Sequence, residues 1–170
     1  MSVPLPPLTP LAAAVLHLDR PPERALVLGC DDGDPVLFLA REFPAARVRG
    51  LDRSEDRIRA ATARVGLDPE GRVAFKQGGG RSIPFPDEHF DLVAALDLKP
   101  SPGEARRVLR PGGSLLLVAT EPGSRLDPNS GWLWRRLRRH GIEQAGHATA
   151  GDGSFSFGHL GGAGRTPASI

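Results

Sequence analysis

Short apolar runs alternate with polar, helix-patterned segments through the first 120 residues. The runs are bounded by charged residues or glycine, as is typical of strands buried on both faces of a sheet. We expect strands at residues 25–28, 48–51, 72–76, 91–96 and 114–119. Helices are expected at residues 10–18, 34–43, 54–65 and 101–109. This alternation predicts an α/β fold with a doubly wound, Rossmann-like, mostly parallel sheet.

Capping residues mark where several helices begin and end. Ser54 and Ser101 stand in N-cap positions, and Asp34 followed by Pro35 has the same pattern. Gly66 suits the end of the helix that Ser54 begins. An Arg-Pro-Gly-Gly segment at residues 110–113 should end the preceding helix before the fifth strand.

The pattern changes after Glu121. Residues 132–140 predict an amphipathic helix with its apolar side chains toward the protein and its arginines outward. Residues 143–149 and 154–159 are candidate strands around Gly-Asp-Gly, a plausible hairpin. We therefore expect one domain over residues 1–160, with a proline-rich leader at 1–10 and a flexible tail at 161–170.

Composition limits the classes of function. The chain has 170 residues, 39% of them hydrophobic and 25% charged, which is ordinary for a soluble globular protein. Cys30 is the single cysteine, so no intramolecular disulfide forms, which fits the cytoplasm. The apolar stretch at 11–18 is too short to span a bilayer. The arginines of residues 132–140 could hold RNA or an anionic membrane, but a net charge of +2 favours a solvated face, and we expect neither partner.

The most informative stretch runs from residue 25 to residue 52. Gly29 and Gly33 lie between the first strand and its helix, and Asp52 ends the second strand. This is the arrangement of a nucleoside-binding β-α-β unit, in which backbone N–H groups face a polar tail and the acid accepts ribose hydroxyls. The plainer alternative is that the glycines only permit a tight turn.

Other chemistry-bearing residues have structural explanations beside the functional ones. Asp31, Asp32 and Asp34 form an acidic cluster that lacks EF-hand spacing, so no metal is predicted. Cys30 is interpreted as inert packing, because no histidine is placed to activate it. Asp97 and Lys99 follow the fourth strand, as a possible general base or as solvated loop charges.

Four segments together resemble the class I S-adenosylmethionine-dependent methyltransferases, in particular the small-molecule branch with a methyltransferase 11-type domain. They are ALVLGCDDG at 25–33, GLDRS at 50–54, IPFPDEHFDLV at 83–93 and RVLRPGG at 107–113. The resemblance implies a sheet of about seven strands ending in an antiparallel hairpin, S-adenosylmethionine as cofactor and a small-molecule acceptor. It also implies a cofactor site made by Gly29, Cys30, Asp31, Gly33, Asp52, Arg53, Gly79, Gly80, Arg81, Leu96 and Asp97.

The sequence also departs from the family's pattern. Val27 replaces an acid, Asp31 replaces the middle glycine of the first motif, and Gly79 replaces an acid that bonds the adenine. The link from Asp97 to Arg110 is short. The Asp31 carboxylate would either repel the cofactor's carboxylate or attract its ammonium group.

Two functions follow from these observations. One is transfer of a methyl group from S-adenosylmethionine to a small molecule. The alternative is a catalytically degenerate module that binds a nucleoside or a partner. No catalytic residue is assigned, because a sulfonium is already a good leaving group and alignment supplies most of the rate.

Overall fold

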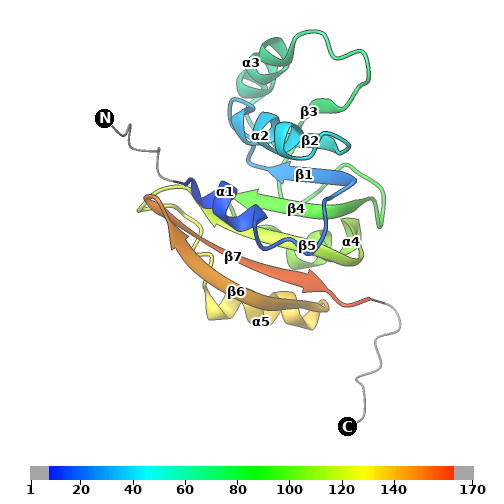
Figure 1. Cartoon of the computed structure of the whole chain (residues 1–170). Coiled ribbons are helices and arrows are strands. Elements are labelled where there is room, and N and C mark those ends of the chain that lie inside the picture. The colour runs from blue at the N-terminus through cyan, green and yellow to red at the C-terminus, as the bar shows by residue number, and fades with distance from the viewer. Residues whose placement is uncertain (1–7, 163–170) are drawn as a thin grey trace.

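One seven-stranded sheet organises the chain, in the order β3-β2-β1-β4-β5-β7-β6 (Figure 1). The structure is a computed structural model and describes residues 8–162. The strands are β1 (Arg24–Leu28), β2 (Arg47–Asp52), β3 (Val73–Gln77), β4 (Phe90–Leu96), β5 (Leu109–Ala119), β6 (Ile142–Ala150) and β7 (Gly153–Leu160). The helices are α1 (Pro10–Val15), α2 (Asp34–Glu42), α3 (Glu55–Val65), α4 (Pro102–Val108) and α5 (Gly131–Arg139).

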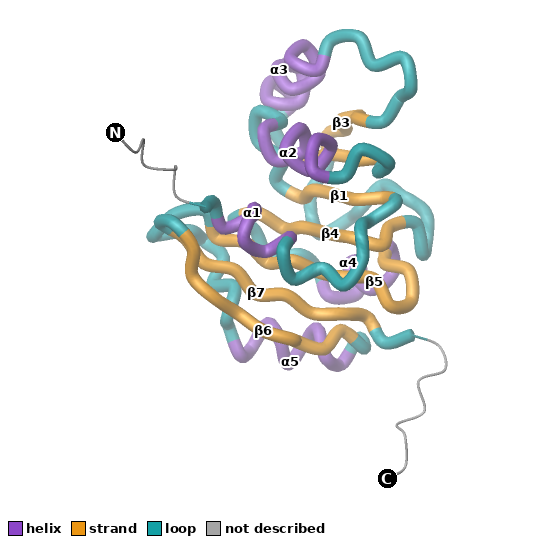
Figure 2. The backbone as a smooth tube through the Cα atoms, in the orientation of Figure 1, coloured by secondary structure: helices purple, strands orange, loops and turns teal. Residues whose placement is uncertain are grey.

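The first five strands pair in parallel, and β7 runs antiparallel to both β5 and β6. Figure 2 shows β6 and β7 side by side at one edge of the sheet. The sequence-based prediction of a mostly parallel sheet with an antiparallel C-terminal hairpin is therefore confirmed. The expected leader (1–10) and tail (161–170) lie mostly outside the described residues, and the single-domain boundary stays a prediction.

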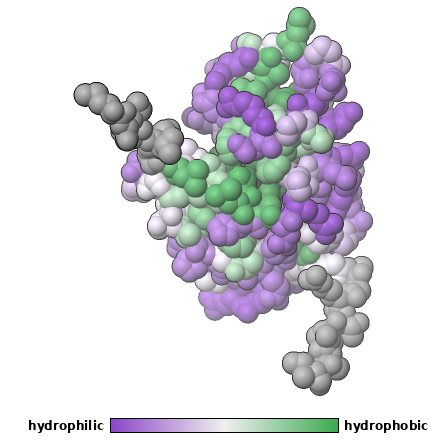
Figure 3. All heavy atoms as spheres, viewed as in Figure 1, coloured by the Kyte–Doolittle hydropathy of each residue, from purple (hydrophilic) through white to green (hydrophobic). Residues whose placement is uncertain are grey.

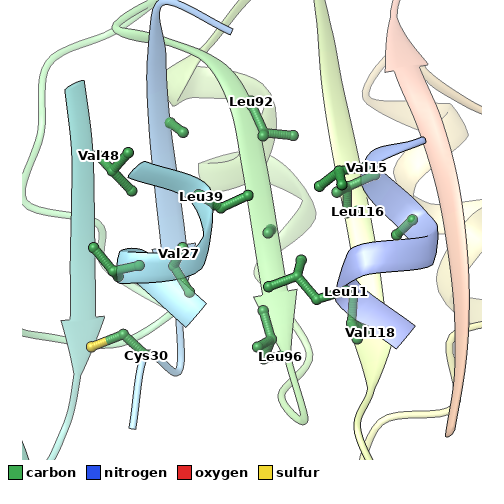
Figure 4. Close-up of a cluster of buried hydrophobic side chains, with 14 of the residues drawn as sticks. Leu11, Val15, Val27, Cys30, Leu39, Val48, Leu92, Leu96, Leu116 and Val118 are labelled. Atoms are coloured by element: carbon green, nitrogen blue, oxygen red, sulfur yellow. The ribbon is translucent and has the colours of Figure 1, made fainter. Parts of the chain in front are cut away.

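Two hydrophobic layers cover the sheet, because alternate side chains of each strand point to opposite faces. Ala25 and Val27 of β1 pack into the layer under α1 and α2, where Leu11 and Leu39 join them (Figure 4). Leu26 and Leu28 belong to the other layer, together with buried residues of α4 and α5. Burial of each such leucine or valine contributes about 1.5–3 kcal/mol. Because both faces of the central strands are buried, these strands are held in place, and so are the residues at their ends.

Several element boundaries differ from the predictions. Helix α1 ends at Val15 rather than residue 18. The N-cap of α2 is Gly33, in the left-handed conformation, and Asp34 is the first helical residue, so the capping role predicted for Asp34 is wrong. Strand β5 begins at Leu109 rather than at residue 114, so residues 110–113 lie within the strand. The pairing of β4 with β5 shifts register in this region.

The caps predicted at Ser54 and Ser101 are confirmed. Each hydroxyl accepts a hydrogen bond from the backbone N–H three residues on. Leu133, Trp134 and Leu137 of α5 are buried, as its pattern predicts. Figure 3 shows hydrophobic residues gathered over α1, and Leu16 just after that helix is 74% exposed.

Candidate functional site

A cavity of about 830 Å³ opens where β1, β2, β4 and β5 reach their carboxyl ends. Open parallel sheets bind ligands at this edge. The cavity is lined by Gly29, Asp31, Asp52, Arg53, Arg57, Gly78, Gly79, Gly80, Arg81, Leu96, Asp97, Leu98, Lys99, Thr120, Glu121 and Arg125. A second cavity, of about 230 Å³, lies at the opposite edge near Pro111 and is smaller than usual small-molecule sites.

The structure brings nine of the eleven predicted site residues into the lining of the large cavity. The two that it leaves out are Cys30 and Gly33. Gly33 has a packing explanation: its φ is +95°, and a Cβ there would lie 3.0 Å from the Phe75 ring and 3.1 Å from Ala61.

Cys30 is fully buried in the hydrophobic layer under α2. Burial, together with the nearby Asp52 carboxylate, raises the pKa of the Cys30 thiol to about 12. The thiol therefore stays protonated near neutral pH, as expected of an inert packing residue and not of a nucleophile.

Asp52 lies at the end of β2, with only 7% of its surface exposed. Its carboxylate accepts hydrogen bonds from the backbone N–H of Asp31 at 3.1 Å and of Ser54 at 2.9 Å. A carboxylate has about four acceptor positions, so two remain for hydroxyl groups from the cavity. Asp52 is thus a rigid, oriented acceptor in the wall of the cavity.

Gly29 allows the turn after β1 to approach the end of β4. Its φ is +76°, and a Cβ would lie 2.6 Å from the carbonyl oxygen of Leu96. The backbone N–H of Gly29 donates to the Leu51 carbonyl at 2.9 Å, which ties the turn to β2. Glycine is required here by both backbone conformation and space.

Arg57 of α3 neutralises the acid that replaces the middle glycine. Asp31 has a φ of +51°, and its carboxylate lies 3.2 Å from Nε of Arg57. Nη1 of the same arginine lies 3.8 Å from the Asp52 carboxylate. The Asp31 carboxylate is therefore turned toward α3 and compensated there.

The other two aspartates of the acidic cluster pair with Arg64, also on α3. Within residues 8–162, no group of three histidine, cysteine or acidic side chains is placed to hold a metal ion. The cluster is consequently a set of ion pairs between the α2 turn and α3.

The glycine loop after β3 forms the wall beside Arg53. A Cβ at Gly79 would lie 2.8 Å from Nε of Arg53, so this side chain lies against the loop. The carbonyl of Gly80 accepts from the backbone N–H of Ser101 at 2.9 Å. The loop is thereby tied to the start of α4.

Asp97 organises the loop after β5. Its carboxylate accepts from the backbone N–H of Thr120 at 2.9 Å, from the Thr120 hydroxyl at 2.6 Å and from the Ser124 hydroxyl at 2.7 Å. Its backbone is in the left-handed region, with a φ of +57°. Three of its acceptor positions are used by these hydrogen bonds, so the Asp97 carboxylate anchors the loop and is not a free base.

Sequence reasoning missed several lining residues. They are Arg57, Leu98, Thr120, Glu121 and Arg125. Arg57 had a usable signal, because it lies in the first turn of the helix that follows Asp52, near the unexpected Asp31. Thr120 and Arg125 lie in an irregular loop whose path no local pattern predicts.

Residues 25–113, just over half of the chain, match the family model described as a methyltransferase domain. A fatty-acid O-methyltransferase of Mycolicibacterium smegmatis is 36% identical over 107 residues, which are 59% of this chain and 38% of that protein. The 27-O-demethylrifamycin SV methyltransferase of Amycolatopsis mediterranei is 36% identical over 118 residues, 65% of this chain and 43% of that protein.

The chain thus spans about two-fifths of the length of these two curated relatives. Among solved structures, a putative methyltransferase in complex with the Haloferax volcanii Trm112 activator superposes with a TM-score of 0.73 at 15% identity. That superposition covers 92% of this chain and 90% of the other, and it supports the fold alone. The chain belongs to the methyltransferase domain family and has the fold of the class I S-adenosylmethionine-dependent methyltransferases.

Proposed function

We propose that the cavity binds S-adenosylmethionine and that the protein transfers its methyl group to a small-molecule acceptor. The observation that carries the proposal is Asp52, a buried carboxylate with free acceptor positions at the end of β2, beside the close turn at Gly29. These residues fit a nucleoside with a charged tail: an oriented acid for the ribose and a side-chain-free turn for close approach.

Each part of the cavity has an assigned role in this proposal. Asp52 accepts from the ribose hydroxyls, and the turn from Gly29 to Asp31 holds the amino-acid tail. Arg53 and the loop of Gly79, Gly80 and Arg81 flank the adenine. The bound cofactor supplies a methyl group on a sulfonium, which needs no general base from the protein when the acceptor is already nucleophilic.

The chain's own contribution is then orientation and exclusion of water. Leu96 and Leu98 lie on the β4 side of the cavity, between the nucleoside end and the loop after β5. Asp97 fixes that loop through Thr120 and Ser124, so the acceptor is held against an ordered wall. We place the acceptor at the ends of β4 and β5 for this reason.

A small-molecule acceptor is supported by the named relatives, one of which acts on a fatty acid and another on a rifamycin. In the part of the chain that the structure covers, no helix is long and apolar enough to cross a membrane. A cytoplasmic location is part of the proposal and is supported by the single cysteine, Cys30, which allows no intramolecular disulfide.

The test is release of S-adenosylhomocysteine from S-adenosylmethionine in the presence of a low-molecular-weight cell extract. We expect release that requires both protein and extract and that falls at least tenfold in Asp52→Asn. Cofactor binding without any extract-dependent release would favour the alternative, a degenerate module that binds the nucleoside only.

A further inference from the structure

Two cationic side chains of the cavity, Lys99 and Arg125, lie at the ends of β4 and β5, away from Asp52. Neither forms an ion pair with another residue between 8 and 162. Two carboxylates share this end of the cavity. Asp97 is turned to Thr120 and Ser124, and Glu121 is exposed. Neither acid therefore neutralises the two cations by direct contact.

Trp132 lies beside Lys99, just outside the residues that line the cavity. It is the first tryptophan of α5, and 51% of its surface is exposed. Nζ of Lys99 lies 5.9 Å from the centre of its ring, and the guanidinium of Arg136 lies 4.9 Å from it. The positive charges of Lys99 and Arg136 lie near the same indole ring and repel each other. An anion bound at this end of the cavity would offset that repulsion.

This exposed indole differs from its neighbour on the same helix. Trp134 is 5% exposed, and its N–H donates to the Pro128 carbonyl at 2.8 Å. Trp134 therefore belongs to the core, whereas Trp132 offers an apolar face beside two cations. Together these groups provide charged donors and, beside Lys99, a flat hydrophobic surface at the end of the cavity formed by β4 and β5.

We propose that the acceptor is an organic acid, with its carboxylate bound by Lys99 and Arg125 and its apolar part on Trp132. This inference rests on the proposed function, which places the cofactor beside Asp52 and the acceptor at the ends of β4 and β5. Guanidinium and ammonium groups form charge-assisted hydrogen bonds with carboxylates, and Trp is an effective apolar contact surface. A neutral analogue of the same shape would lose those bonds and leave the cations unpaired.

The test compares matched acids and amides on the full chain with S-adenosylhomocysteine present. Suitable pairs are benzoate and benzamide, octanoate and octanamide, and tricarballylate and its triamide. Binding is measured by calorimetry and by tryptophan fluorescence, with Trp132→Phe to assign the signal. We expect at least one acid to bind at least tenfold more tightly than its amide, and that preference to fall about tenfold in Lys99→Gln and in Arg125→Gln.

Arg139→Gln is the matched control, since it removes one exposed cation of α5, the helix that carries Trp132, and the cations over the Trp132 ring are Lys99 and Arg136. It should leave the acid-to-amide preference unchanged. The inference is overturned when no acid binds more tightly than its amide, or when Arg139→Gln lowers the preference as much as Lys99→Gln. Failure of S-adenosylhomocysteine to bind would contradict the proposed function instead. The acid and amide pairs would then be compared without S-adenosylhomocysteine, and that comparison would still decide this inference.

Discussion

The carboxylate of Asp31 lies 3.2 Å from Nε of Arg57, at the rim of the cavity that Asp52 also faces. The two side chains are 65% and 59% exposed, so the pair itself contributes little to folding. Its importance is local, because Arg57 offsets two carboxylates in a site expected to receive a cofactor carboxylate. An unfavourable substitution in the glycine turn is thus compensated from the neighbouring helix.

Arg57→Gln should weaken binding of S-adenosylhomocysteine about fivefold, because one uncompensated charge near 4 Å in a wet site costs about 1 kcal/mol. The double variant Asp31→Gly with Arg57→Gln should return to wild-type affinity, which calorimetry would show. A double variant as weak as Arg57→Gln alone would mean that Arg57 contacts the cofactor directly.

Gly29→Ala should destabilise the protein by about 2–4 kcal/mol and abolish cofactor binding. The new methyl group would lie 2.6 Å from the Leu96 carbonyl oxygen, in a backbone conformation that alanine disfavours. Gly112→Ala is the matched control, because Gly112 has a φ of +80° with no atom within 4 Å. Urea unfolding measures both; equal losses of stability would show that the close approach to β4 is not the cause.

Asp97→Asn should loosen the loop after β5 without removing a base. The amide keeps the left-handed backbone accessible but loses charge-assisted bonds from Thr120 and Ser124. We expect faster tryptic cleavage after Arg125 and a loss of about 1–3 kcal/mol of stability. Asp152→Asn, at the hairpin tip, should change neither. An unchanged cleavage rate at Arg125 would argue against an anchoring role.

Glu104 and Arg107 of α4 bind the proline-rich segment before β4. Because Glu104 is ionisable, the free energy of unfolding should depend on pH. The Glu104 carboxylate accepts from Arg107 and from the backbone N–H of Ile83 at 2.7 Å, and Arg107 donates to the carbonyls of Ile83 and Phe85. The hydrogen bond from Arg107, and then that from Ile83, lower the pKa of Glu104 from its usual 4.5.

Because the folded-state pKa is lowered, this stabilisation is present above pH 4.5 and is lost as the pH falls through the folded-state value. Glu104→Gln should therefore cost about 1–3 kcal/mol at neutral pH, and its deficit relative to wild type should narrow below pH 4.5. Denaturation at several pH values checks this, with the exposed Glu70→Gln as control. A deficit that stays constant with pH would refute the charge-based explanation.

The sequence predicts those parts of the fold and site that depend on local pattern. Buried strands appear in the sequence as apolar runs. Gly29 and Asp52 occur in one β-α-β unit, so their shared position at the cavity follows from spacing. The partners of Arg57 and Asp97 come from separate segments, and no periodicity determines which of these side chains meet. Local pattern can also mislead within a turn, as at Asp34, which resembles an N-cap in the sequence. In the structure Gly33 is the N-cap, with a left-handed backbone against Phe75, and Asp34 pairs with Arg64.

Calorimetric titration of the full chain with S-adenosylhomocysteine, wild type beside Asp52→Asn and the exposed control Asp56→Asn, tests the central claim most directly. The account predicts micromolar binding to wild type and to Asp56→Asn, weakened at least tenfold in Asp52→Asn. Absence of binding to wild type at millimolar ligand, or equal binding to wild type and Asp52→Asn, would contradict it.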